Sequence, residues 1–412
     1  MHRSSVFSVR SHSRHSKWTD MSIALDRAAR GMYAAEHDGW TDVVDGGGLT
    51  AFRRAEKRYK LHRTQIVRTR ADGRRKGGAL ETRLVDLSAV VDTLNLASLA
   101  REPGTRVSVH GASSSKSEVH ERTHPAAYAI DGHPGAVLVP NALSVDEQRE
   151  WVRIAVTESC EPPARTNHDA ALGPLKGLWR EAHARPSRYV RVPSTDDGAG
   201  RGDTETETGW RHISPEPTGG DPRVNLAATR LLEKMRWATI GPPYDWTARA
   251  YDTDAPRRPV NPRWLERCVD LAEAAGAAGD FAGEFAGLVN YYRSGDQLAG
   301  HVDDAEVDMS KPIVSVSLGC PCVFLLGGRS RDVAPTAVLM RSGDAVVLTG
   351  PSRRCYHGVP RIFVAGEGCV DGDGVRLGCP EWLGNPDAWA EEPDVARYIA
   401  GGRVNVSVRV VD

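Results

Sequence analysis

The sequence has few cysteines and no long apolar segment, and each shortage argues against a class of protein. Seven cysteines in 412 residues, an odd number without zinc-ligand pairs, argue against a disulfide framework and indicate a reducing compartment. No apolar run approaches the eighteen or more residues of a membrane span. Net charge is also missing, because 53 Lys and Arg nearly balance 54 Asp and Glu. Any surface that attracts a polyanion must therefore be local.

The N-terminal region carries such a local excess of positive charge. Ala51–Gly78 holds eleven Lys or Arg against two acids, a composition that suits binding to phosphate backbones. A solubilising tail or a nuclear localisation signal fits the same composition equally well. The first nineteen residues are basic, rich in serine and free of acids, as in an organellar transit peptide or a basic tail. The location is therefore expected to be intracellular, with nucleus, cytoplasm, mitochondrion and plastid left open.

The chain is long enough for one large domain with extensions. We expect a targeting or disordered segment over 1–50, a basic helix or arm with a linker over 51–125, and a catalytic domain over 126–412. An irregular insertion, dense in Gly, Pro, Thr and Asp, is predicted at 194–222. Helices are expected at 144–158, 225–237 and 262–276. Strands are expected at 136–140, 286–292, 313–318, 323–326, 336–340, 345–348 and 403–411, as in a double-sheet jelly roll.

The stretch from Leu288 to Asp304 reads as a strand, a turn and half of a metal site. In an extended strand, His301 and Asp303 lie on one face, roughly 6 to 7 Å apart, and can converge on one ion. The only histidine after Asp303 is His357. Two imidazoles and one carboxylate form the facial triad of non-haem Fe(II) oxygenases, which leaves positions open for a co-substrate and oxygen. His-x-Asp alone is a weak signal, because a surface strand with ordinary polar residues has the same spacing.

The C-terminal strand adds a second signal. Alternation in RVNVSVRVV places four valines on one face, and Arg403, Asn405, Ser407 and Arg409 on the other. Guanidinium groups offer paired donors that match carboxylate oxygens, so this face suits a dicarboxylate. An amphipathic edge strand facing water is the competing interpretation.

Together these motifs resemble the AlkB family of 2-oxoglutarate- and Fe(II)-dependent dioxygenases. The resemblance rests on Asn290-Tyr291-Tyr292, His301-x-Asp303, His357, and Arg403-x-Asn405 with Arg409, in matching order and spacing. Flanking text such as HVDDAEVDMSKPIVSVSLG and YHGVPR is most similar to the eukaryotic AlkB homologue one branch. The resemblance covers roughly residues 132–412, with a weaker echo near 51–63 and a break at 194–222.

The resemblance implies an α+β fold with a double-stranded β-helix core, flanking helices and a basic, partly disordered N-terminal extension. It implies that Fe(II) is bound by His301, Asp303 and His357. It further implies a 2-oxoglutarate pocket lined by Asn290, Tyr292, Arg403, Asn405 and Arg409, with Arg409 on a carboxylate. The chemistry implied is hydroxylation of an N-methyl group, which then leaves as formaldehyde.

At the substrate end, the family would place aromatic side chains over a flipped base. Trp237, Tyr244 and Trp246 match those positions, and Arg331 matches an arginine at the substrate mouth; ordinary core aromatics remain an alternative. Ala305 stands where bacterial AlkB has an acid, which leaves base preference open. We expect a monomer, without a membrane, that demethylates nucleic acid bases, tRNA ahead of DNA. A protein or histone demethylase or hydroxylase, and a nucleic-acid-binding protein with a vestigial iron site, are the alternatives.

Overall fold

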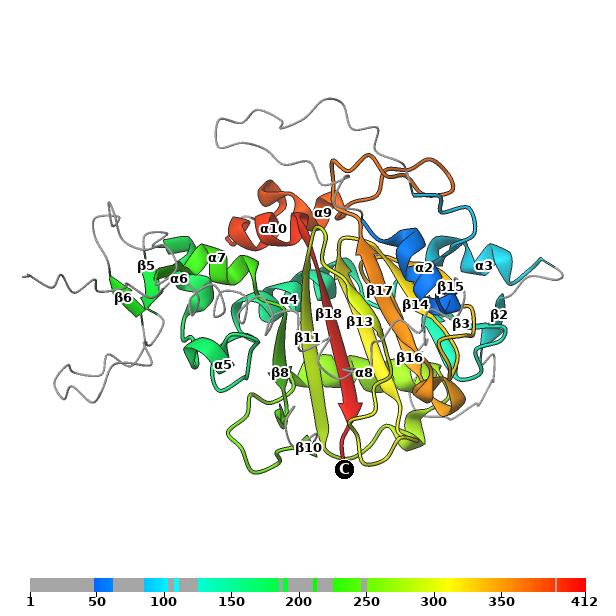
Figure 1. Ribbon diagram of the computed structural model, residues 1–412, viewed down its shortest axis with the longest axis horizontal. Coiled ribbons are helices and arrows are strands. Elements are labelled where there is room, and N and C mark those ends of the chain that lie inside the picture. The colour runs from blue at the N-terminus through cyan, green and yellow to red at the C-terminus, as the bar shows by residue number, and fades with distance from the viewer. Residues whose placement is uncertain are drawn as a thin grey trace, which may run out of the picture.

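The computed structural model, shown in Figure 1, has two β-sheets that face each other and helices that cover their outer faces. No helix in the described part of the chain is long and apolar enough to cross a membrane. The structure describes residues 48–61, 85–102, 107–110, 125–184, 188–191, 210–212, 225–245, 250–389 and 391–412.

The larger sheet has eight strands and is antiparallel in its pairings. In spatial order these are β2 (Val107–His110), β3 (Ala127–Ile130), β4 (Ala136–Val139), β16 (Ala345–Leu348), β13 (Ile313–Gly319), β18 (Gly402–Val410), β11 (Phe285–Arg293) and β8 (Trp237–Ile240). The C-terminal strand β18 therefore lies in the interior of the sheet, between β13 and β11 (Figure 1). Its central position excludes the water-facing edge strand that was the competing interpretation of the sequence.

The smaller sheet has five strands and carries two of the predicted metal ligands. Its order is β1 (Val91–Asp92), β15 (Thr336–Met340), β14 (Cys322–Leu326), β17 (His357–Ile362) and β12 (Leu298–His301). Side chains from both sheets form one apolar cluster, which includes Leu138, Val346, Phe324 and Met340. Apart from the parallel pair β1 and β15, the strands of both sheets pair antiparallel, and the two sheets packed in this way form the jelly-roll core that the sequence predicted.

Alternation along β18 determines what each face of the large sheet contacts. The four valines from Val404 to Val410 pack into a core beneath the helices. That core includes the indoles of Trp151 and Trp264, whose ring centroids are 5.1 Å apart. The polar residues of β18 consequently point toward the small sheet.

Helix α4 (Val145–Thr157) begins at the capping box predicted from the sequence. The Ser144 hydroxyl accepts from the Glu147 amide, and the Glu147 carboxylate accepts from the Ser144 amide at 2.8 Å. Together with α8 (Pro262–Ala274), it covers the large sheet (Figure 1). The helices are α2 (Ala51–Tyr59), α3 (Leu96–Leu99), α4 (Val145–Thr157), α5 (Asp169–Leu172), α6 (Leu178–Ala184), α7 (Ala228–Glu233), α8 (Pro262–Ala274), α9 (Glu381–Gly384) and α10 (Pro393–Ala400).

Short elements complete the described part of the chain. The 3-10 turns are η2 (Thr93–Asn95), η3 (Ala278–Asp280), η4 (Gly350–Arg354) and η5 (Pro386–Ala388). Strand β9 (Tyr244–Asp245) pairs with β10 (Ala250–Tyr251). A separate three-stranded sheet contains β6 (Trp210–His212), β5 (Arg188–Arg191) and β7 (Asn225–Ala227). The helix predicted over 225–237 was too long. Its two ends pair as β7 and β8, so sheet pairing prevails over the apolar helical pattern there.

Helix α2 packs on the outer face of the small sheet, against β12, β14 and β17. Phe52 is buried there with Val323, Leu325 and Phe363. Strand β1 pairs with β15, and β2 pairs with β3. The domain boundary predicted at residue 126 thus falls between two paired strands of one sheet. The back half of the predicted basic arm and most of the predicted insertion at 194–222 lie outside the described residues.

Candidate metal and co-substrate site

Two of the three predicted metal ligands come from neighbouring strands of the small sheet, and the third comes from the loop after one of them. His301 is the last residue of β12, His357 is the first of β17, and the two stand opposite each other in the antiparallel register. Asp303 follows in the loop after β12, two residues beyond His301. The pairing of two strands therefore brings together residues that are more than fifty positions apart.

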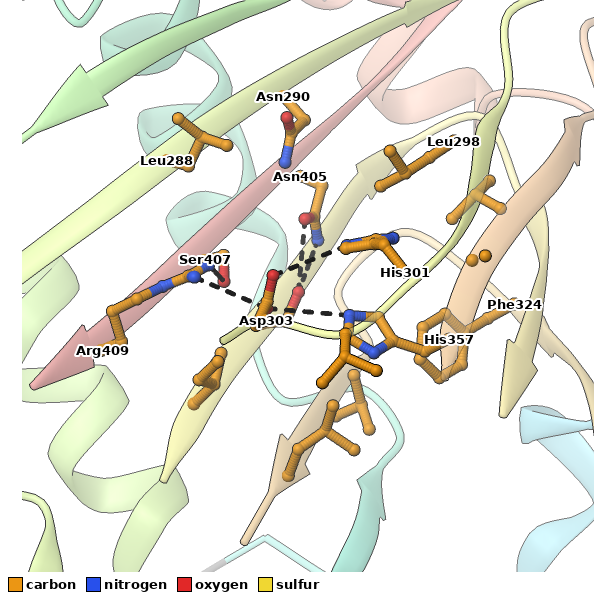
Figure 2. A pocket seen from close by; sticks show the side chains of 18 of the residues that line it. Leu288, Asn290, Leu298, His301, Asp303, Phe324, His357, Asn405, Ser407 and Arg409 are labelled. Carbon is orange, nitrogen blue, oxygen red and sulfur yellow. Dashed lines mark hydrogen bonds and ion pairs between the residues drawn. The ribbon is translucent and has the colours of Figure 1, made fainter. Parts of the chain in front are cut away.

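The donor atoms of this triad converge (Figure 2). Asp303 Oδ1 lies 3.5 Å from His301 Nε2, and Asp303 Oδ2 lies 3.7 Å from His357 Nε2. Two ligands bound at right angles, each with a bond of roughly 2.1 Å, would lie about 3 Å apart. A small inward movement would therefore bring all three onto one ion. Two nitrogens and one oxygen suit Fe(II) and leave positions open.

Backbone carbonyls orient both imidazoles. His301 Nδ1 lies 2.9 Å from the Ala299 carbonyl, and His357 Nδ1 lies 3.2 Å from the Cys355 carbonyl. A carbonyl oxygen only accepts, so each ring carries its hydrogen on Nδ1 in these contacts. That tautomer leaves the Nε2 lone pair of each ring available to a metal.

The charges of the site favour the metal-binding forms of Asp303 and His357. Burial by itself raises the pKa of Asp303. The opposing effects of Arg409 and the two imidazoles are larger together and hold this pKa well below its usual range. Burial and the neighbouring His301 lower the pKa of His357. Burial lowers the pKa of His301 as well, yet the hydrogen bond and charge of Asp303 bring it above the usual value.

The triad lies at the wall of a cavity of about 480 Å³ between the two sheets. All of the residues predicted to bind the co-substrate line this cavity: Asn290, Tyr292, Arg403, Asn405 and Arg409. Asn290 and Tyr292 come from β11, and the other three come from β18. These two strands pair with each other, so Asn290 lies opposite Asn405 and Tyr292 lies opposite Arg403. Figure 2 shows Asn290, Asn405 and Arg409 around the triad.

The two arginines of β18 differ in their partners. Arg409 Nη1 lies 3.0 Å from Glu306 Oε1 and 3.5 Å from Asp303 Oδ2, and Nη2 donates to Ser407. Arg403 is 4 % exposed and donates from Nη2 to Ser317 Oγ at 2.8 Å. Within the described part of the chain, its Nε and Nη1 have no hydrogen-bond partner and no carboxylate forms an ion pair with it. A buried cation with unused donors fits an anionic ligand.

The predicted substrate residues are only partly brought together. Tyr244 and Arg331 line the cavity, and Arg331 donates to the Gly300 carbonyl at 3.0 Å. Trp237 is buried in β8 opposite Asn290 and is not among the residues that line the cavity. Trp246 lies outside the described residues.

Sequence reasoning missed four residues of the site. Tyr251 lines the cavity, and its ring centroid is 5.2 Å from that of Tyr244. Glu306 and Arg353 form a buried ion pair behind Asp303, and Arg53 reaches the cavity from α2. Glu306 stands three positions after a metal ligand, so its place in the chain was a usable signal. Arg353 stands four positions before His357 and had the same kind of signal, whereas Tyr251 and Arg53 are distant in sequence from the triad and had none.

Helix α2 supports the strand that carries His301. The Glu56 carboxylate accepts from the Gly300 amide at 2.7 Å, and Phe52 packs so closely that a Cβ on Gly300 would lie 2.3 Å from its ring. On the same residue, Arg331 binds the carbonyl. Gly300 is therefore held through both its amide and its carbonyl, directly before the metal ligand.

The sequence is similar to known proteins that share these features. The profile of the 2OG-Fe(II) oxygenase superfamily matches residues 202–409. The Arabidopsis thaliana protein named DNA N(6)-methyladenine demethylase ALKBH1A is 33% identical over 90% of this chain and 98% of that protein. The chain belongs to the AlkB family of 2OG-Fe(II) oxygenases. As an AlkB-family protein it is a dioxygenase.

Two further AlkB-family relatives match over shorter stretches. The human nucleic acid dioxygenase ALKBH1 is 31% identical over 69% of this chain and 66% of that protein. The Schizosaccharomyces pombe tRNA demethylase abh1 is 30% identical over 58% of this chain and 72% of that protein. The family resemblance predicted from the motifs is therefore confirmed, and so is the jelly-roll fold.

Proposed function

We propose that this AlkB-family protein removes methyl groups from nucleic acid bases in a reaction that depends on Fe(II) and 2-oxoglutarate, with tRNA favoured over DNA. One observation carries the proposal: a single cavity holds the His301, Asp303 and His357 donors and the buried Arg403, two of whose nitrogens have no hydrogen-bond partner among the described residues. A metal triad and a buried cation together match a small ligand that chelates iron and also bears a carboxylate. The names of the relatives, which refer to DNA, nucleic acid and tRNA, support the substrate class.

The residues have separable tasks. His301, Asp303 and His357 would hold Fe(II). Arg403 would bind the carboxylate that lies far from the metal, because its buried Nε and Nη1 have no partner in the part of the chain that the structure describes. Arg409 lies within 3.5 Å of Asp303 and would face the carboxylate next to the metal.

When bound, Fe(II) would activate O2, which is the oxidant, while 2-oxoglutarate would supply two electrons: its oxidative decarboxylation would give succinate and CO2, with one oxygen atom of O2 in succinate and the other in a C–H bond of the substrate. Hydroxylation of an N-methyl group gives a hemiaminal. The hemiaminal releases formaldehyde and leaves the N–H of the unmodified base. The protein's own contribution is to bind, orient and exclude water.

Aromatic and basic residues that line the cavity suit a nucleotide. Tyr244 and Tyr251 present aromatic rings with an interplanar angle of 61°, and a flipped base can stack on such rings. Arg53 and Arg331 also line the cavity, where a guanidinium can bind a phosphate. Both ends of a nucleotide would therefore find a suitable partner.

The test is to incubate the iron-loaded protein and 2-oxoglutarate with a panel of substrates. The panel comprises methylated tRNA, single-stranded and duplex DNA with N6-methyladenine, and methylated histone peptides, with succinate and formaldehyde as readouts. We expect formaldehyde from the nucleic acids, at the highest kcat/KM from tRNA, and none from Asp303→Ala. Formaldehyde only from the peptides would replace the substrate class. Absence of succinate with every substrate would indicate a vestigial iron site and overturn the proposal.

A further inference from the structure

Besides Asp303, the loop after β12 carries the buried acid Glu306. Glu306 is 5 % exposed and does not line the cavity, whereas Ala305 beside it does. Both carboxylate oxygens are used. Oε1 accepts from Arg409 Nη1 at 3.0 Å and from the Tyr251 hydroxyl at 2.9 Å, and Oε2 accepts from Arg353. Glu306 therefore serves groups of the protein and does not contact a ligand in the cavity.

Arg353 fixes this acid and the whole loop. Its side chain is 1 % exposed and donates to the Asp303 carbonyl, to the Lys311 carbonyl at 3.0 Å and to Glu306. These contacts tie both ends of the loop to η4, which precedes His357. The ion pair with Arg353 already balances the charge of the Glu306 carboxylate. The additional contact between Glu306 and Arg409 therefore has another role.

The position of Arg409 explains what the second contact does. Its Nη1 is closer to Glu306 than to Asp303, at 3.0 Å against 3.5 Å. If Glu306 were neutral, the strongest remaining attraction on this guanidinium would come from Asp303. The Arg409 guanidinium would then move toward Asp303 and compete with the metal ion for the Asp303 carboxylate. The charged Glu306 instead holds Arg409 in its present position. There the Arg409 Nε has no partner in the described part of the chain and is available to donate to a ligand.

We propose that Glu306 is a positioning residue that holds Arg409 off Asp303 and in place to receive the 2-oxoglutarate carboxylate beside the metal. The inference rests on the proposed function, because it assumes that 2-oxoglutarate binds in this cavity. It assigns Glu306 no contact with the nucleotide.

The experiment compares Glu306→Gln with Asp308→Asn, which changes an acid of the same loop whose side chain is exposed and bonds to Ser310. Binding of 2-oxoglutarate to the Fe(II)-loaded protein is measured by calorimetry without oxygen, and KM and kcat are measured separately. We expect Glu306→Gln to raise the Kd and KM for 2-oxoglutarate at least tenfold. At saturating 2-oxoglutarate its kcat should stay within about threefold, and Asp308→Asn should match the wild type.

Two controls make the outcome decisive. In an Arg409→Gln background, Glu306→Gln should cause no further loss of 2-oxoglutarate affinity, because the acid acts through that arginine. Should Glu306→Gln fail to fold, Glu306→Asp carries the test, since it keeps the charge beside Arg353 but shortens the reach to Arg409. An unchanged 2-oxoglutarate Kd in the folded variant overturns the inference alone. A wild-type protein that does not bind 2-oxoglutarate overturns the proposed function itself.

Discussion

Replacing Arg403 by methionine should have opposite effects on ligand binding and on the stability of the ligand-free protein. The side chain is buried, with one hydrogen bond to Ser317 and two nitrogens without partners among the described residues. Its guanidinium carbon lies 5.2 Å from the Tyr292 ring centroid. These contacts are few for a buried cation, so the protein maintains Arg403 at an energetic cost that a ligand would offset.

The magnitudes follow from these contacts. Loss of a buried, hydrogen-bonded charge pair costs roughly 2 to 5 kcal/mol, so Arg403→Met should weaken 2-oxoglutarate binding by roughly 30-fold to 4,000-fold. In the ligand-free protein the variant loses the Ser317 hydrogen bond, about 1 kcal/mol. It also loses a buried unpaired charge, which more than offsets that loss. Its melting temperature should therefore equal or exceed that of the wild type.

The assay is thermal unfolding with a chelator present, followed by anaerobic calorimetry with Fe(II) and 2-oxoglutarate. Arg353→Met is the matched control, because it removes an equally buried arginine whose guanidinium has three partners. It should lower stability by roughly 3 to 5 kcal/mol, since Glu306 is left without that partner. If Arg403→Met instead lowers stability as much as the control does, and still binds 2-oxoglutarate normally, then Arg403 is a structural residue and the co-substrate assignment is wrong.

Three other changes test the metal site, the helix on the small sheet and the basic segment. Asp303→Ala should abolish Fe(II) binding measured by calorimetry, whereas Asp308→Ala should not, because only the former supplies a ligand. Phe52→Ala should lower the unfolding free energy by roughly 3 to 5 kcal/mol in denaturant titrations, and exposed Lys57→Ala by little. Deletion of residues 63–78 should make nucleic acid binding less dependent on salt. The slope of log binding constant against log salt concentration should fall by roughly 0.7 to 0.9 for each phosphate that the variant no longer binds. Turnover of a short oligonucleotide should be unchanged.

The sequence correctly predicted features that depend on residues close together in the chain. The period of two along β18 correctly separated the valines of the core from the residues that line the cavity. The capping box at Ser144 correctly placed the start of α4. Where a pattern fits two structures, as at 225–237, pairing with distant strands decided the outcome.

Contacts through space leave no such pattern. Nothing in the sequence around Glu306 shows whether its carboxylate faces the cavity or Arg353, which is 47 positions away. Tyr251 contacts Glu306 from 55 positions away. The grouping of His301, Asp303 and His357 was predictable because a short motif and a single remaining histidine limited the choice.

The contacts of α2 change how an experiment on the basic segment must be designed. The sequence suggests that all of Ala51–Gly78 is an electrostatic arm, and a deletion of the whole stretch would test that hypothesis. In the structure, however, Glu56 binds the Gly300 amide and Phe52 packs against the same residue, immediately before His301. Removing α2 would thus disturb the strand that carries a metal ligand, and a loss of turnover would say nothing about charge. Only a deletion that starts beyond Leu61 keeps this support, so only that variant separates nucleic acid affinity from the integrity of the iron site.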